Sequence, residues 1–118
     1  MSGHNALHQQ LDSDYVMLDP GNGEALVVDR DRGMVELVTA AAETRTLEDP
    51  TKSGVMLTLT MKVDGGNCVI TADTALNQAG NTIMTFADAA DTILLVSIPD
   101  GTSGYKWKIL GNDGVALS

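Results

Sequence analysis

Aromatic residues are scarce in this chain of 118 residues, which has only four: Tyr15, Phe86, Tyr105 and Trp107. With so few rings, a hydrophobic core must be built mainly from Val, Leu, Ile, Met and Ala side chains. The same scarcity leaves little material for a surface on which sugar rings or unpaired bases could stack. The composition therefore argues against carbohydrate and single-stranded nucleic acid as ligands.

Basic residues are also few: seven lysines and arginines stand against sixteen acids, which gives a net charge of −9. Binding to a phosphate backbone or to an anionic membrane surface requires clustered positive charge, and no three basic residues are consecutive here. Apolar runs are no longer than four residues, as at Ile93–Val96, and so are too short to cross a bilayer. We predict no direct nucleic acid partner and no membrane partner.

Cysteine is limited to Cys68, so a disulfide within the chain is impossible. A nucleophilic cysteine needs a base within reach, and the only histidines, His4 and His8, lie some sixty residues earlier in the chain. We therefore predict that Cys68 is a small apolar filler within a strand. The first fourteen residues lack the basic and apolar regions of a signal peptide, so we expect synthesis in a cytosol.

Patterns typical of an active site or a metal site are missing as well. No serine occupies a Gly-x-Ser-x-Gly turn. Residues 29–33 (Asp-Arg-Asp-Arg-Gly) begin like a calcium loop but lack its third acid and its distant glutamate, so we interpret them as a solvated turn. We interpret His4 and His8 as exposed side chains of the terminus. The sequence predicts no enzyme, no cofactor and no metal.

What the chain does contain is a period of two from residue 24 onward. In residues 55–63, Val, Leu, Leu, Met and Val alternate with Met, Thr, Thr and Lys, as in a half-buried strand. Similar short runs recur about every ten residues, separated by Gly-, Pro- and Asp-rich turns. This spacing predicts an all-β fold, a compact β-sandwich or small barrel of about eight short strands, β-tulip or jelly-roll-like.

The stretch Asp64-Gly65-Gly66-Asn67 lies between two of these runs. It could form a ligand loop or the bend between two strands. A cation site would need further oxygen ligands at regular spacing, and an anion site would need a following helix; neither is present. Because glycine tolerates the positive φ of tight turns, we predict that residues 55–72 form a β-hairpin.

The first two dozen residues differ from the rest. We predict an extended N-terminal arm over residues 1–23 and a single β-rich domain over residues 24–118, because residues 1–14 are polar and residues 19–23 form a turn cluster. Within this arm, four consecutive apolar residues are the predicted contact with a partner: Tyr15, Val16, Met17 and Leu18.

Four segments carry a family resemblance: residues 39–51 (TAAAETRTLEDPT), 63–72 (VDGGNCVITA), 77–96 (NQAGNTIMTFADAADTILLV) and 107–118 (WKILGNDGVALS). Together they resemble the head decoration, or cement, proteins of tailed bacteriophages, over roughly two-thirds of the chain. The resemblance implies a β-rich virion protein, commonly a homotrimer, that binds the major capsid protein on the capsid exterior at local three-fold positions. It also implies that the protein locks the expanded head against the pressure of packaged DNA, and that the arm contacts the capsid or a neighbouring copy.

Two other kinds of protein fit the same composition. One is a trimeric domain of a tail fibre or baseplate, although no internal repeat is visible in the sequence. The other is a non-enzymatic ligand-binding β-module, which would need a lined cavity. A pocket with convergent polar groups would favour the binding module, whereas a flat interaction face would favour a cement protein.

Overall fold

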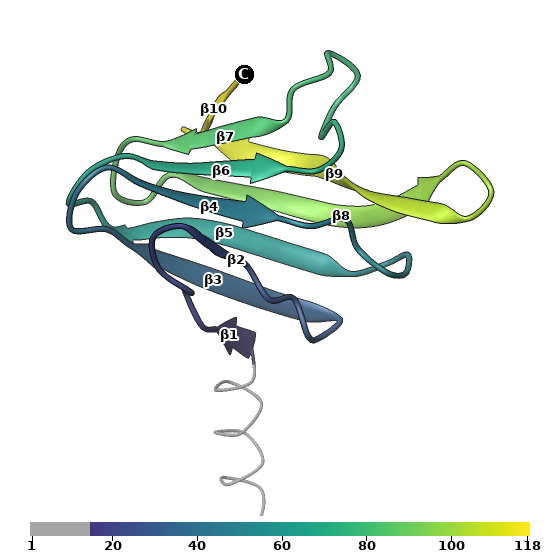
Figure 1. The fold of residues 1–118 in the computed structure, drawn as a ribbon, viewed down its shortest axis with the longest axis horizontal. Helices are drawn as coiled ribbons and strands as arrows, with labels where there is room; N and C mark the ends of the chain where they lie inside the picture. The colour runs from purple at the N-terminus through teal and green to yellow at the C-terminus, as the bar shows by residue number, and fades with distance from the viewer. Residues whose placement is uncertain (1–14) are drawn as a thin grey trace, which may run out of the picture.

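The computed structural model describes residues 15–118, which form ten β-strands in two five-stranded sheets (Figure 1). The predicted all-β sandwich is confirmed. Sheet A contains, in spatial order, β1 (Val16–Met17), β3 (Arg32–Val38), β5 (Met56–Val63), β8 (Thr92–Asp100) and β9 (Gly104–Asp113). Sheet B contains β10 (Ala116–Leu117), β7 (Ile83–Phe86), β6 (Cys68–Ala72), β4 (Glu43–Leu47) and β2 (Glu24–Ala25).

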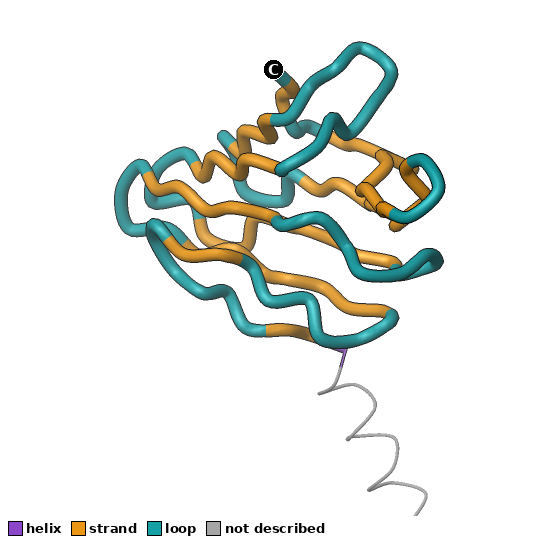
Figure 2. Tube along the Cα trace, turned by 45° about the vertical axis from the view of Figure 1, so that its right-hand side comes forward, coloured by secondary structure: helices purple, strands orange, loops and turns teal. Residues whose placement is uncertain are grey.

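The first six strands alternate between the two sheets, so that the chain winds as a short flattened coil. β1, β3 and β5 are parallel neighbours in sheet A, and β2, β4 and β6 are parallel neighbours in sheet B. Figure 2 shows the loops at the two ends of the sandwich that carry the chain from strand to strand. The remaining strands pair antiparallel and complete both sheets.

The core lies between the sheets, where alternate residues of each strand point inward. In β5, Leu57, Leu59 and Met61 are buried, whereas Met56, Thr58 and Thr60 are half-exposed. The buried side chains of both sheets form one cluster, in which Phe86 and Trp107 are the only aromatic members. Burial stabilises the fold by about 1.5–3 kcal/mol for each large apolar side chain, so aliphatic residues supply most of the driving force, as the composition predicts.

The predicted hairpin over residues 55–72 is wrong. β5 pairs with β3 and β8 in sheet A, whereas β6 pairs with β4 and β7 in sheet B, so residues 64–67 cross from one sheet to the other. Neither Gly65 nor Gly66 has a positive φ. Their lack of a side chain serves close approach instead: a Cβ on Gly65 would lie 2.8 Å from Ala40 Cα, and one on Gly66 would lie 2.5 Å from the backbone nitrogen of Ala42.

The residues assigned to an arm are described from Tyr15 onward, and from there the chain lies in the sandwich. Val16 and Met17 form β1, which pairs with β3. The Gly23 backbone nitrogen donates to the carbonyl oxygen of Thr44 at 2.7 Å. Residues 16–23 are therefore part of the body, and residues 1–14, with His4 and His8, lie outside the described residues.

Candidate functional site

The loops at one end of the coil are stacked tightly. Residues 39–42, which join β3 to β4, contact residues 64–67, which join β5 to β6. The buried Thr39 hydroxyl donates to the carbonyl oxygen of Gly66 at 2.6 Å and accepts from the backbone nitrogen of Gly65 at 3.0 Å. Backbone groups are thus paired across successive loops, and this end of the sandwich is closed.

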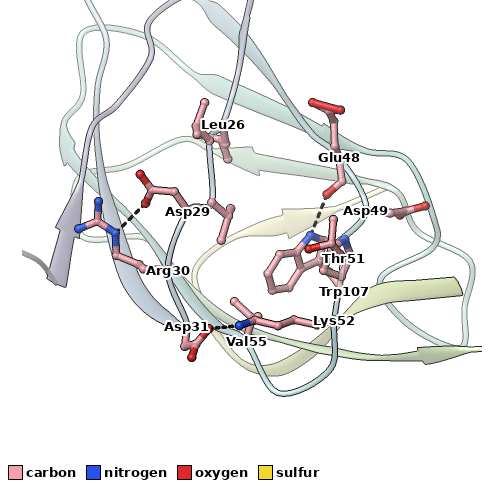
Figure 3. Close-up of a pocket in the computed structure, with 13 residues that line it drawn as sticks. Leu26, Asp29, Arg30, Asp31, Glu48, Asp49, Thr51, Lys52, Val55 and Trp107 are labelled. Carbon is pink, nitrogen blue, oxygen red and sulfur yellow. Dashed lines mark hydrogen bonds and ion pairs between the residues drawn. The ribbon is translucent and has the colours of Figure 1, made fainter.

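The opposite end is open. The loop of residues 26–31, between β2 and β3, and the loop of residues 48–55, between β4 and β5, line a cavity of about 480 Å³ (Figure 3). This volume is within the usual range of ligand sites. Leu26, Val55 and Trp107, each with at most 5% of its surface exposed, form the apolar part of the lining. The Trp107 indole nitrogen donates to the Glu48 carbonyl oxygen at 2.9 Å, which fixes the ring against the loop.

Charged side chains surround the mouth of this cavity, and the acids outnumber the bases. Asp29 is paired with Arg30 at 2.8 Å, and Asp31 is paired with Lys52. Glu48 and Asp49 also line the cavity, and neither is ion-paired with another described residue. The four acids and two bases leave a net charge of −2. Residues 29–33 were interpreted as a solvated turn, but residues 29–31 of this stretch line the cavity, which the sequence pattern did not predict.

A buried arginine lies between the sheets at the closed end. Arg45 of β4 is fully buried; its Nε donates to Asp19 Oδ1 at 2.7 Å, and its Nη2 donates to Asp19 Oδ2 at 3.0 Å and to Glu43 Oε1 at 3.0 Å. Asp19 also accepts from the backbone nitrogen of Val38 at 2.9 Å. Asp19 therefore joins the N-terminal segment to both sheets. The Arg45 Nη1 atom has no hydrogen-bond partner among the described residues.

The pKa values of this cluster reflect the pairing. Desolvation by burial works to raise the pKa of Asp19, but the hydrogen bonds that Asp19 accepts from Arg45, Val38 and Gly21 outweigh it and lower that pKa. The backbone nitrogen of Ala40 and the Arg45 guanidinium lower the pKa of Glu43. Desolvation opposes the charge on Arg45, but the bond to Asp19 outweighs it and raises the pKa of the guanidinium. All three groups are therefore charged at neutral pH, and the cluster is a structural ion pair rather than an acid–base site.

Cys68 is fully buried at the start of β6, as predicted for an apolar filler, and its burial raises the pKa of the thiol. Only the thiolate reacts readily with disulfide reagents. We expect Cys68 in native buffer to react with a thiol-specific reagent at least about a thousandfold more slowly than in urea, because reaction requires unfolding. Absorbance of the released thiolate during the reaction measures both rates, and rapid native labelling would show that Cys68 is accessible.

The outer face of sheet A carries a group of apolar side chains although it faces away from the core, and Glu36, Thr58, Thr60 and Thr92 point outward beside them. Six half-exposed or exposed side chains make up this group: Val16, Met34, Met56, Leu94, Val96 and Ile98. The strand registers pair Val16 with Met34 and Met56 with Val96, whereas Thr58 lies between Met34 and Leu94. Lys106 and Lys108 of β9, opposite Ile98 and Val96, border this surface.

The outer face of sheet B differs in chemistry. Its outward positions on β4, β6 and β7 are mostly threonine: Thr44, Thr46, Thr71 and Thr85. Threonine exposes a hydroxyl and a single methyl group, so this face suits contact with water. Val69 and Ile83 are the half-exposed apolar side chains among these threonines, so the outer face of sheet A is the more apolar of the two. Exposed groups of apolar side chains typically mark sites of protein contact.

Of the four predicted contact residues, one is buried in the core and three are exposed. Met17 points into the core with 4% of its surface exposed, so it stabilises the sandwich and is not on the surface. Tyr15 and Val16 are each 41% exposed, and Leu18 is 84% exposed. Of these, Val16 is the one that the register places among the apolar side chains on the outer face of sheet A.

Within residues 15–118 there is no group of three or more His, Cys, Asp or Glu side chains arranged to hold a metal ion. The same part of the chain has no helix of the length and hydropathy needed to span a membrane. In comparisons with known proteins, no family model and no curated sequence matches the chain.

Proposed function

We propose that this chain is a structural virion protein, a decoration or cement protein that binds the outside of the expanded head of a tailed phage. The observation that carries the proposal is the group of apolar side chains on the outer face of sheet A, which offers an exposed surface for a protein partner. The sequence resemblance supplies the partner, the major capsid protein, and a homotrimer at local three-fold positions. In this role the protein stabilises the expanded shell because it binds that state preferentially.

Immunogold labelling of phage particles, with antibody to this chain, tests the location. We expect gold over the whole head. Gold confined to the tail would instead support the fibre or baseplate alternative, and absence of label from intact and opened particles would contradict both virion roles.

Introducing a charged side chain on the outer face of sheet A tests whether this surface binds the capsid. Val96 is half-exposed on β8 beside Met56, so Val96→Glu is expected to leave the fold intact while burying an unpaired carboxylate in any interface there. We expect its occupancy on heads lacking the wild-type protein to fall at least about tenfold, measured by quantitative gel analysis of purified particles. Thr71→Glu, on the outer face of sheet B, is the matched control and should bind normally. Equal occupancy of both variants would contradict the proposal.

The cavity at the open end favours the second candidate, a non-enzymatic binding module. Its volume is sufficient, but two of its acids are already paired with bases at the rim, so few polar groups converge on its interior. A protein can also carry both features, with the apolar side chains on one face and the cavity at one end.

A further inference from the structure

The cavity has a feature that a small-molecule pocket does not need, an unpaired stretch of backbone along its wall. β2 is an edge strand of sheet B, and the chain continues past it through Leu26, Val27 and Val28. The Leu26 backbone nitrogen still donates to the Thr46 carbonyl oxygen at 2.9 Å. No backbone–backbone hydrogen bond among the described residues involves Val27 or Val28, and the Val27 side chain is 67% exposed.

Unpaired backbone at a sheet edge readily accepts another extended chain, which supplies the missing donors and acceptors. Here the edge segment adjoins an apolar hollow lined by Leu26, Val55 and Trp107. A strand placed along the edge would direct alternate side chains to one side, where the hollow can receive an aliphatic group. The unpaired backbone of Val27 and Val28 and the adjoining cavity therefore both fit an extended peptide.

The charge at the mouth specifies the ligand further. Asp29 and Asp31 are neutralised locally by Arg30 and Lys52, so the surplus negative charge comes from Glu48 and Asp49. The Thr74 hydroxyl donates to Asp49 Oδ2 at 2.9 Å, which leaves Asp49 Oδ1 and the Glu48 carboxylate as acceptors for a ligand. A lysine or arginine fits this arrangement, because its methylene stem can pack on the apolar lining while its charged end approaches these oxygens. The chain's own residues 1–14 contain neither lysine nor arginine, so they do not match.

We propose that the open end of the sandwich binds an extended peptide segment of another protein, one that carries a lysine or arginine beside an aliphatic residue. The segment adds to the edge at Val27 and Val28 and inserts a side chain between residues 26–31 and 48–55 (Figure 3). The assignment does not depend on whether the partner belongs to a phage head.

The test uses the full-length protein labelled with ¹⁵N and the capped peptide Ac-Thr-Val-Lys-Val-Thr-NH2. Trp107 is the only tryptophan, so its indole signal reports on the cavity without ambiguity, and the Val27 and Val28 amides report on the edge. We expect saturable shifts of all three signals at peptide concentrations up to about 10 mM. Replacing the peptide's lysine with uncharged norleucine should weaken binding about tenfold, and glutamate should abolish it. A version with N-methylated backbone amides should also fail, because it cannot pair with an edge.

Variants of the protein test whether the preference for a lysine in the peptide comes from Glu48 and Asp49. Glu48→Gln combined with Asp49→Asn keeps the shape of the mouth and should weaken lysine-peptide binding about tenfold, without changing the affinity for the norleucine peptide. Asp64→Asn, an exposed acid at the closed end, has the same charge change per residue and should bind like the wild type.

Five results would overturn the proposal, the first four of which concern the ligand. These are absence of saturable shifts at Trp107, equal binding of the glutamate peptide, equal binding of the N-methylated peptide, and shifts with n-butylammonium as strong as with the peptide, which would mean a free-amine site. The fifth is a shift of the Trp107 signal when only the protein concentration is raised. In that case the cavity would be occupied by β9 of a second copy, which carries Lys106 and Lys108.

Discussion

Alanine at position 66 is expected to lower the free energy of unfolding by about 3 kcal/mol or more, although it adds a single methyl group. The added Cβ would lie 2.5 Å from the Ala42 backbone nitrogen, and it would meet the Ala41 carbonyl group as well. These are backbone atoms of the stacked loop, so they cannot swing aside as a flexible side chain would. Relief requires separation of the two loops and loss of the bonds made by the Thr39 hydroxyl.

Urea unfolding followed by tryptophan fluorescence measures this loss, since Trp107 is buried in the native state. Gly111→Ala is the matched control: Gly111 has no positive φ, and a Cβ there would have nothing within 4 Å. The control should change the unfolding free energy by less than about 0.5 kcal/mol. If both variants unfold at the same urea concentration as the wild type, then the two loops do not pack as closely as described.

The strands themselves were predictable because their signal is local. In residues 55–63, alternation of apolar and polar side chains identifies β5, and it also identifies which side chains are buried. Turn residues such as Pro99-Asp100-Gly101 mark the region between long strands, and β8 and β9 do form a hairpin there. Fold class follows from these features alone.

Strand pairing was not predictable in the same way. Alternation shows that a strand has one buried face, but it does not show which of two facing sheets the strand belongs to. Asp64-Gly65-Gly66-Asn67 suits a hairpin by local turn chemistry, whereas the glycines are required by contacts with residues 39–42, some twenty-five positions earlier. The role of Asp19 was missed for the same reason, because its partner Arg45 lies in a different strand and sheet from β1.

The apolar side chains on the outer face of sheet A could be predicted from the sequence, whereas the cavity at the open end could not. Thr92–Ile98 is apolar at nearly every position, and a strand of that kind must either be buried on both sides or present an apolar face outward. Met56 carries the same signal in β5. The cavity had no such signal, because it results from how two loops are spaced at the end of the coil.

Removing the Asp19 carboxylate is expected to have an effect comparable to that of the methyl group at position 66. Asp19→Asn should lower the free energy of unfolding by about 3 kcal/mol at pH 7, because the fully buried Arg45 loses its main counter-ion. Asp29→Asn is the matched control, since the Asp29–Arg30 pair is exposed and such pairs contribute about 0–1 kcal/mol. Urea unfolding of the three proteins measures the difference; equal losses would mean that burial of Arg45 does not matter.

The pH dependence of this difference separates charge from shape. The pKa of Asp19 in the folded protein lies below its ordinary value of 3.8, so its charge stabilises the fold fully above that value. This contribution is lost as pH falls through the lowered pKa of the folded state, where the native carboxylate takes up its proton. The unfolding free energies of wild type and Asp19→Asn should therefore converge below about pH 4. A difference that stays constant down to pH 2.5 would show that Asp19 acts through the hydrogen bonds that it accepts from the Val38 and Gly21 backbone nitrogens, and not through its ion pair with Arg45.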